Sequence, residues 1–452
     1  MSHDMDPLEE LNAEIIEEIF QYLTAKELLE SSLVSQSWYD FIADSNICMK
    51  RLKIKISKDC VNDGIEYLKK SKRNYENLML KEVVDPIRFN DALQILSQPE
   101  RQFKNIEMQV IRFPTQTTFH NLMQTIQNSV EVLHLEQLIL CDNDLLSSAQ
   151  SYCCPKLKNL TLISCQINEF FIISNNLTTL NIISNYGLVN ATVVDNFQNL
   201  LCINNHLHTL TLSGNIITQI FCDDITDKIH FKLNEFKVTN FNVDKFHNRS
   251  TIEKNFNLFL KTQPNIKKIF IGEWLGTTVL ETVFNEMKSL NDLTIMELAK
   301  ANPLIPFGRN ELEGPEIVRT NVSNLKSNPS IIKLDYQDIC GNIFTMKSLL
   351  EAAPNLRSFS TYSMNQEMLQ MLATKMSNLE YLSVSFFDAG DIVYHPIFLK
   401  LQVFASLRLE EELIQSITLK EPENRNHFEK VIFECFIDRN TASFNLISSH
   451  TL

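Results

Sequence analysis

Glycine is scarce in this sequence, and its scarcity argues against one large group of proteins. Nine glycines among 452 residues leave no glycine-rich loop of the kind that holds nucleotide phosphates. Long apolar runs are also missing, because no stretch reaches the roughly 18 apolar residues of a membrane-spanning helix. Residues 1–7 carry no apolar segment of a secretion signal. We therefore expect neither a nucleotide-binding fold nor a membrane protein.

Metal-site and disulfide patterns are lacking as well. The ten cysteines are scattered along the chain without a C-x-x-C pair, and no Cys/His group has the spacing of a zinc site. We expect reduced, mostly buried thiols in a cytoplasmic or nuclear protein, with no metal and no cofactor. The formal net charge, 41 − 55 = −14, argues against a general affinity for nucleic acid.

The stretch LNAEIIEEIFQYLTAKELLESSLVSQSWYDFI, residues 11–42, is dense in apolar residues. Their helical spacing predicts three short helices. Asn12 is the expected N-cap of the first helix, and Thr24 with Glu27 forms a capping-box pattern at the second. In the first helix the apolar face is expected to hold Ile15, Ile16, Ile19, Phe20 and Leu23. A block this small cannot form a firm core alone, so its apolar residues either pack on the following domain or dock a partner.

This block resembles an F-box. The residues that carry the resemblance are Leu11, Glu14, Ile15, Ile19, Phe20, Leu23, Leu28, Leu29, Val34, Ser35, Trp38 and Tyr39. Asn12 stands where the family usually has proline, which removes a rigid start to the first helix. The resemblance implies binding to a Skp-family adaptor and, through it, to a cullin. The expected adaptor-binding residues are Leu11, Ile15, Ile16, Ile19, Phe20, Leu23, Leu28, Leu29, Val34 and Trp38, although some of them must hold the helices together.

The rest of the chain repeats the pattern apolar-x-x-apolar-x-apolar. The fourteen copies begin at Tyr75, Phe103, Val130, Leu157, Leu177, Leu207, Leu233, Ile266, Leu290, Ile331, Leu356, Leu379, Phe404 and Phe428. For the thirteenth copy, FASLRL from Phe404 fits the template best, and LQVFAS from Leu401 is a competing register. Most steps lie within or near the roughly 20–29 residues of leucine-rich repeats.

Three copies extend into the longer leucine-rich-repeat pattern, which places Asn or Cys after the strand. LHTLTLSGNII puts Asn215 at this position, LKNLTLISCQI puts Cys165 there, and LTTLNIISNYG puts Asn185 there. We expect this side chain to turn inward and to hydrogen-bond the backbone of the bend. Cys165 therefore has a predicted structural role rather than a reactive one.

The segments between the repeated strands have helical periodicity. One predicted helix buries Ile252, Phe256, Phe259 and Leu260, and another buries Leu280, Val283, Phe284 and Met287. Pro155, Pro264 and Pro354 each precede a strand motif by two residues, where they are expected to end a helix. The predicted fold class is α/β: a short three-helix F-box followed by a leucine-rich-repeat solenoid, an α/β horseshoe with parallel strands on the concave face and helices outside.

We expect three parts: an F-box at 1–50, a linker and first edge strand at 51–74, and about 14 repeats with a C-terminal cap at 75–452. The edge strand is RLKIKIS, and the cap would use Phe444, Leu446 and Ile447. The long loop 296–330 is either a lip over the concave face or a tolerated surface insertion. LKKSKR, residues 68–73, is either a nuclear localisation patch or a solvated helix end.

The resemblance implies a substrate receptor of SCF-type ubiquitin ligases, in which the F-box binds the adaptor and the repeats bind a target protein. An alternative is an F-box scaffold that acts without ubiquitination. An enzyme is disfavoured, since the pair Cys153–Cys154 has no nearby histidine in the sequence. The expected target-binding residues face solvent on the strands and are Lys158, Asn159, Thr161, His208, Thr209 and Thr211. No nucleic acid and no membrane are expected as partners.

Overall fold

The computed structural model of the chain describes residues 7–60, 62–71, 75–98, 101–113, 115–140, 150–165, 170–184, 191–239, 249–272, 277–297, 325–338, 343–388, 403–406 and 430–433. These residues divide into two compact units. The first consists of Met1–Leu207 with Ile229–Phe231, and the second of His208–Lys228 with Lys232–Leu452. Each unit is built from the same strand-and-helix repeat.

The first unit begins with a helical block. Its helices are α1 (Pro7–Glu10), α2 (Ala13–Phe20), α3 (Ala25–Ser31), α4 (Gln36–Asp44) and α5 (Asn46–Met49). The three predicted helices are α2 to α4. Thr24 and Glu27 form the predicted capping box at α3, whereas Asn12 occupies the N-cap position of α2 without a side-chain cap hydrogen bond. Pro7 begins an extra helix, α1, whose Leu8 packs against the core of the block.

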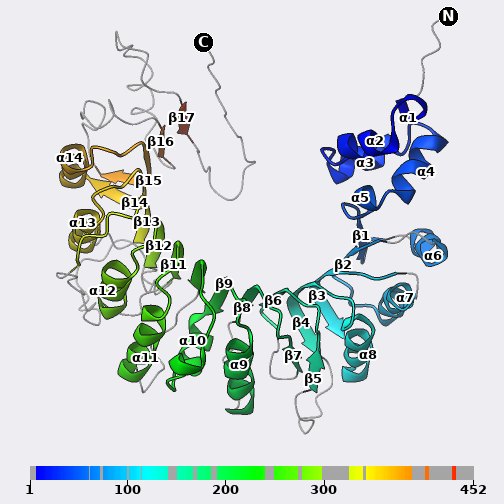
Figure 1. Cartoon of the computed structure of the whole chain (residues 1–452), viewed down its shortest axis with the longest axis horizontal. Helices are drawn as coiled ribbons and strands as arrows, with labels where there is room; N and C mark the ends of the chain where they lie inside the picture. The colour runs from blue at the N-terminus through cyan, green and yellow to red at the C-terminus, as the bar shows by residue number, and fades with distance from the viewer. Residues whose placement is uncertain are drawn as a thin grey trace, which may run out of the picture. The chain divides into compact units, whose positions relative to one another are not determined.

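A parallel sheet follows the block in the first unit, in the order β1-β2-β3-β4-β6-β8 (Figure 1). Its strands are β1 (Lys53–Ser57), β2 (Asn77–Lys81), β3 (Asn105–Phe113), β4 (Val132–Leu140), β6 (Asn159–Ile163) and β8 (Thr179–Ile183). Burial alternates along each strand: Leu78 and Leu80 are buried, and Asn77, Met79 and Lys81 are partly exposed. The second and fourth residues of a strand therefore form the core, as the repeated motif predicts.

The second unit continues this pattern in the order β9-β10-β11-β12-β13-β14-β15-β16-β17. Its strands are β9 (Thr209–Ser213), β10 (Glu235–Thr239), β11 (Lys268–Gly272), β12 (Asp292–Glu297), β13 (Lys333–Asp338), β14 (Ser358–Asn365), β15 (Tyr381–Asp388), β16 (Val403–Ser406) and β17 (Lys430–Phe433). Corresponding motif positions of neighbouring repeats lie opposite each other. Each of these strands is parallel to its neighbours, as a right-handed strand–helix solenoid requires.

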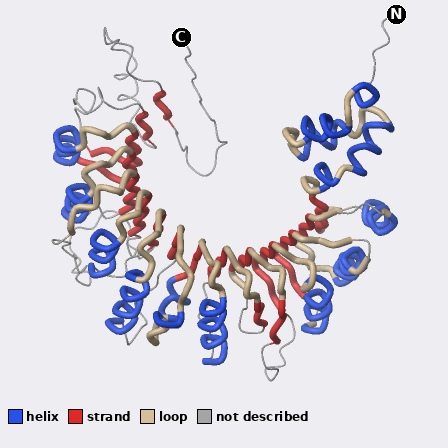
Figure 2. Tube along the Cα trace, viewed as in Figure 1, coloured by secondary structure: helices blue, strands red, loops and turns tan. Residues whose placement is uncertain are grey.

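Helices connect the strands within each unit and lie on one side of them (Figure 2). In the first unit these are α6 (Asn62–Lys70), α7 (Pro86–Leu96), α8 (Gln116–Ile126) and α9 (Ala191–Ile203). In the second unit they are α10 (Gly214–Ile220), the 3-10 turn η1 (Thr226–Lys228), α11 (Arg249–Lys261), α12 (Thr277–Glu286), α13 (Ile343–Ala352) and α14 (Gln366–Lys375). The eight apolar residues predicted to be buried on the helices of 249–287 are all buried. We call the other side of the strands, formed by their first, third and fifth residues, the open face.

One connection was predicted as a helix and is instead a strand. β5 (Gln150–Cys153) and β7 (Phe170–Ile173) form a separate two-stranded parallel sheet. Pro155 therefore follows a strand, and the expectation of a helix end at this proline is wrong. Aromatic and β-branched residues explain the outcome, because FFII favours an extended chain and packs against Phe119 and Phe197 of the neighbouring helices.

The thirteenth repeat corrects the chosen sequence register. Val403 lies opposite Tyr381 and Phe404 opposite Leu382. Tyr381 is the third residue of the motif that begins at Leu379, so the matching motif begins at Leu401 and not at Phe404. The sequence FASLRL has the more apolar pattern, but the hydrogen-bonded neighbour strand sets the register.

Four equivalent residues turn the chain sharply just after the fifth strand position. Glu82, Val110, Gln137 and Ser164 all have φ between 51° and 55°. After this turn β3 and β4 pair again, from Ile111 opposite Leu138 to Phe113 opposite Leu140. The left-handed conformation is unfavourable for a β-branched residue, so Val110 is strained at this position.

We therefore expect the substitution Val110→Asn to raise the free energy of unfolding by about 1 kcal/mol, because asparagine tolerates the left-handed conformation. Val110 is 39% exposed, so little packing is lost. Urea unfolding checks the prediction, with Val84→Asn as a control at an exposed valine that has no positive φ. Equal effects of the two substitutions would show that the backbone conformation is not the cause.

Several sequence predictions lie outside the described residues. These are Asn185, the cap residues Phe444, Leu446 and Ile447, and most of the loop 296–330. No helix among the described residues has the length and apolar character needed to cross a membrane. Of the seven described cysteines, Cys48, Cys154 and Cys165 are buried, while Cys153 and Cys222 are exposed.

Candidate functional site

The helical block exposes apolar side chains along one face of its second helix. Leu11, Ile15 and Ile19 are 40%, 50% and 47% exposed. Ile15 and Ile19 are four residues apart on α2 and form one stripe, and Leu11 lies just before the helix begins at Ala13. Contiguous exposed apolar residues of this size usually mark an interaction surface. This stripe is the first part of the candidate site.

The second part of the site comes from α3 and the turns before and after it. Leu29 and Val34, both predicted from the sequence, are 57% and 65% exposed. Tyr22 and Leu33 are exposed even more fully, at 78% and 83%, but sequence reasoning missed them. Leu33 directly precedes Val34 in SSLVS, so the local apolar pair was the available signal. We call Leu11, Ile15, Ile19, Tyr22, Leu29, Leu33 and Val34 together the apolar face of the block.

The remaining predicted contact residues point inward. Ile16, Phe20 and Leu28 are buried, and Leu23 and Trp38 pack partly against them. The single apolar face predicted for α2 is therefore two faces, one inside the block and one in solvent. Sequence spacing alone could not separate them, because Ile15 and Ile16 are adjacent and equally apolar.

The core of the block also includes the start of the sheet. Leu52 is buried in the same cluster, and Tyr75 packs against it. The side-chain amide of Asn77, in β2, donates hydrogen bonds to the carbonyl oxygens of Lys50 (2.6 Å) and Leu52 (3.1 Å). These contacts hold the block on the first repeats, so the inward apolar residues do pack toward the following strands. The inward residues thus follow the first alternative for the block, and the exposed residues are the candidates for docking a partner.

The open face of the first unit holds three of the residues predicted to bind a target. Asn159 and Thr161 are partly exposed on β6, and Lys158 is exposed just before it. Each already interacts within the chain. Lys158 pairs with Glu131 at 2.7 Å, and Thr161 accepts a hydrogen bond from the Asn181 amide at 3.1 Å.

The other three predicted residues lie in the second unit. His208 is exposed and Thr209 is partly exposed, but Thr211 is only 7% exposed. Thr211 therefore offers a partner very little surface. The strands beyond β9 carry larger and more charged side chains on the open face, including Lys237, Phe270 and Asp335.

Asp335 is an acidic residue of this open face whose pKa is shifted. Burial raises the pKa of its carboxyl group, while the amide of Gln337 and the charge of Lys333 act in the opposite direction. A raised folded-state pKa means that folding favours the protonated acid, so this contribution to stability is lost as pH rises through that pKa.

We expect Asp335→Asn to raise Tm by a few degrees at neutral pH, because the amide keeps the acceptor for Gln337 without burying a charge. The advantage should shrink as the pH falls below the range in which the wild-type carboxyl ionises. Thermal unfolding of both chains across acidic and neutral pH is the measurement. A difference that does not vary with pH would mean that ionisation of Asp335 is not the cause.

Two cysteines singled out in the sequence, Cys154 and Cys165, lack the properties of reactive residues. Cys165 donates hydrogen bonds to the carbonyl oxygens of Leu135 (3.3 Å) and Ile163 (3.4 Å), as predicted for its inward position. Burial raises its pKa to about 11 and that of Cys154 to about 12, so both are thiols rather than reactive thiolates. Asn215, predicted to act like Cys165, instead lies partly exposed in the first turn of α10.

Within the described ranges, no group of three His, Cys, Asp or Glu residues is arranged to hold a metal ion.

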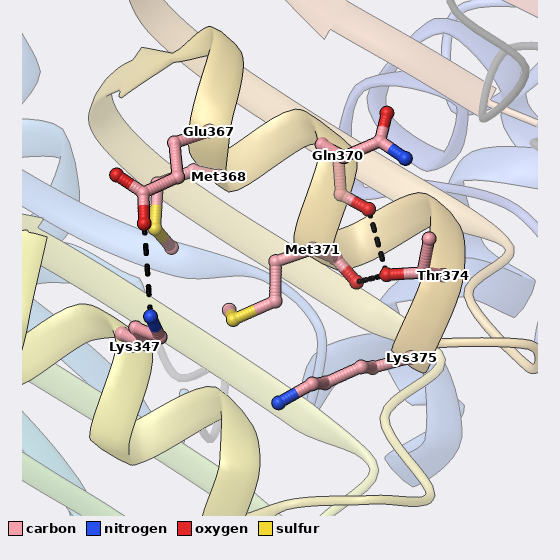
Figure 3. A pocket seen from close by; sticks show the side chains of 7 residues that line it. All are labelled: Lys347, Glu367, Met368, Gln370, Met371, Thr374 and Lys375. Atoms are coloured by element: carbon pink, nitrogen blue, oxygen red, sulfur yellow. Dashed lines mark hydrogen bonds and ion pairs between the residues drawn. The ribbon is translucent and has the colours of Figure 1, made fainter.

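A shallow groove of about 520 Å³ lies between α13 and α14 (Figure 3). Met368 and Met371 form its floor. Ion pairs between Lys347 and Glu367 (3.6 Å) and between Lys375 and Glu351 (2.7 Å) join the two helices across it. Since its charges are paired internally, the groove has the features of an ordinary helix–helix junction.

Comparison with known proteins agrees with the geometry of the helical block. Residues 8–50 match the family model of the F-box domain. No curated protein matches the chain. Two solved structures are similar: the TLR13 chain of a TLR13–ssRNA13 complex, at 11% identity and a TM-score of 0.40, and the internalin InlF from Listeria monocytogenes str. 4b F2365, at 14% identity and a TM-score of 0.33.

These similarities cover 85% of this chain and 48% of the TLR13 chain, and 88% of this chain and 95% of the internalin. The chain therefore spans about half the length of the TLR13 chain. The repeat architecture itself follows from the parallel pairing of the main-sheet strands within each unit and from the motif spacing described above.

Proposed function

We propose that this chain, which carries an F-box domain at residues 8–50 followed by a leucine-rich-repeat solenoid, is the substrate-recognition subunit of an SCF-type ubiquitin ligase in the cytoplasm or nucleus. The F-box binds a Skp-family adaptor, which links the chain to a cullin. The repeats hold a target protein. The observation that carries the proposal is the apolar face of the block, which is exposed at seven positions.

The proposal requires one property of the F-box surface and another of the repeats. The apolar face must lose its contact with water, and burying apolar surface contributes about 25 cal/mol per Å². The repeats must present a broad surface without a catalytic centre, because the chain acts by raising the concentration of target lysines near the ubiquitin thioester. The contacts of Leu52, Tyr75 and Asn77 with the block support this role, since a firmly held block defines where the first repeats lie relative to the adaptor.

Direct binding to a purified Skp-family adaptor tests the proposal. We expect the wild-type chain to form a stoichiometric complex in gel filtration after co-expression. The double variant Ile15→Glu, Ile19→Glu should lose this complex, because it places two charges in the stripe on α2 that must become dry. Both residues are about half exposed in the free chain, so the substitutions should leave the fold intact.

Ile87→Glu is the matched control. Ile87 is 71% exposed on α7, outside the F-box, so this variant should bind the adaptor as the wild type does. Absence of a complex with the wild-type chain would reject the receptor function. A complex that forms without any change in turnover of a bound target would favour the scaffold function instead.

A further inference from the structure

Four neighbouring strands of the second unit carry an alternating row of charges on the open face. The first residues of β10 to β13 lie opposite one another in register: Glu235, Lys268, Asp292 and Lys333. Lys333 pairs with Asp292 at 3.1 Å. The row therefore forms a mixed-charge surface, one part of which is already neutralised within the chain.

An aromatic residue lies in the next row of the same strands. The ammonium group of Lys237 lies 4.5 Å from the centre of the Phe270 ring, which is a favourable cation–π distance. Gly272, two residues further along β11, permits the Phe270 ring to pack closely against the strand, because a Cβ atom there would come within 3.1 Å of the ring and 2.9 Å of the Val238 carbonyl oxygen. Aromatic side chains, phenylalanine included, are enriched at protein interfaces.

Asp335 occupies the same row on β13. Its carboxylate accepts a hydrogen bond from the Gln337 amide at 2.5 Å, while the nearest lysine of its own strand, Lys333, is engaged by Asp292. Among the residues that the structure describes, no lysine, arginine or histidine forms an ion pair with Asp335. A partly buried carboxylate without a paired cation carries a desolvation cost that a basic group from outside the chain would offset.

Several open-face residues of the first unit already have partners within the chain. On β6 and β8 the polar groups already satisfy one another, as in the hydrogen bonds from Asn181 to Thr161 (3.1 Å) and from Thr178 to Asn159 (3.0 Å). On β3, Glu107 is paired with Lys53 at 2.7 Å. Their exposed polar atoms therefore gain less from a partner than Asp335 does.

We propose that the open face of β10 to β13 is the target-binding surface of this chain, and that the target presents a lysine or arginine side chain to Asp335. This inference rests on the proposed receptor function and names the chemistry of its target. The Phe270 ring supplies contact area beside the charge. The net charge of −14 favours the approach of a basic segment.

The test is selection of a phage-displayed library of random linear peptides on the immobilised full-length chain. Peptides enriched on the wild-type chain should contain lysine or arginine at one shared position. Their affinity for the Asp335→Asn variant should fall about tenfold, equivalent to about 1.4 kcal/mol. Asp227→Asn, a substitution at an exposed aspartate of η1, is the matched control and should bind the peptides unchanged.

The inference is overturned if the wild-type chain enriches no peptide with a shared basic residue, or if Asp335→Asn binds the enriched peptides as well as the wild type does. Thermal unfolding of each variant separates loss of binding from loss of fold. Co-purification with the Skp-family adaptor is measured on the same variants. Retained adaptor binding with no basic preference would reject this inference alone, whereas lost adaptor binding by the wild-type chain would reject the proposed function.

Discussion

Replacement of Phe20 by alanine is expected to unfold the F-box, whereas replacement of its neighbour Ile19 is expected to leave it folded and to weaken adaptor binding. Phe20 is 3% exposed and Ile19 is 47% exposed. The two residues are adjacent on α2 and point in directions about 100° apart around the helix axis. They therefore separate the folding of the block from its function.

The size of the Phe20 effect follows from its contacts. Its ring centre lies 5.4 Å from that of Trp38 and 5.6 Å from that of Phe41, the latter in an edge-on arrangement. Truncating a buried phenylalanine to alanine costs about 3–5 kcal/mol, which is comparable to the whole stability of a block of this size. Trp38→Ala would remove part of the same core, so Trp38 is poorly suited to a binding test.

The measurement combines tryptophan fluorescence during urea unfolding with gel filtration in the presence of the adaptor. Phe20→Ala should shift the first unfolding transition and abolish the complex. Ile19→Ala should leave the transition within about 0.5 kcal/mol of the wild type and weaken the complex about tenfold or more. Equal losses of stability in both variants would mean that the inward and outward faces of α2 are not distinct.

Replacement of Asn204 by alanine is expected to destabilise the first unit by about 3 kcal/mol, because it leaves buried backbone groups without partners. Asn204 is 1% exposed. Its side-chain oxygen accepts a hydrogen bond from the backbone N–H of Leu177 at 2.8 Å. Its amide donates to the carbonyl oxygens of Ser174 and Leu200, both at 2.7 Å.

The same arrangement recurs in the second unit. Gln263 accepts from the backbone N–H of Leu233 at 2.9 Å, and Asn328 donates to the carbonyl oxygens of Phe284 and Met287. Each of these amides lies three residues before the first apolar position of a repeat and binds the turn of the preceding repeat. Such side chains replace hydrogen bonds that no strand or helix supplies at the turn.

Urea unfolding of Asn204→Ala, compared with Asn199→Ala, checks this prediction. Asn199 lies in the last turns of α9, shortly before Asn204, but is exposed, so its substitution should change the free energy of unfolding by less than about 0.5 kcal/mol. Asn204→Asp is a further test, because it keeps the acceptor for Leu177 and loses both donors. If Asn204→Ala is as stable as the control, the inter-repeat amide is not needed for folding.

Periodic patterns made most of the architecture predictable. Hydrophobic spacing located fourteen strand motifs, and thirteen of them have the expected register, from Asn77 in β2 to Lys430 in β17. The exception at Leu401 arose where two registers had similar apolar patterns, and only pairing with Tyr381 separated them. The sheet of β5 and β7 was missed because the short FFII segment contains too few residues to distinguish strand from helix by periodicity.

Assignment of residues to the candidate sites depended more heavily on three-dimensional contacts than prediction of the architecture did. The sequence alone identified an F-box from its residue types, since the spacing of leucine, isoleucine and tryptophan is local information. Whether a given apolar residue lies inside or outside depends on which neighbour covers it. Phe20 is buried in the core of the block with Trp38 and Phe41, whereas Ile19 remains 47% exposed. Likewise, Asp335 differs from other open-face polar residues because the lysine of its own strand, Lys333, is paired with Asp292 on the neighbouring strand. These two residues are 41 positions apart in the sequence, so no local sequence pattern predicts their contact.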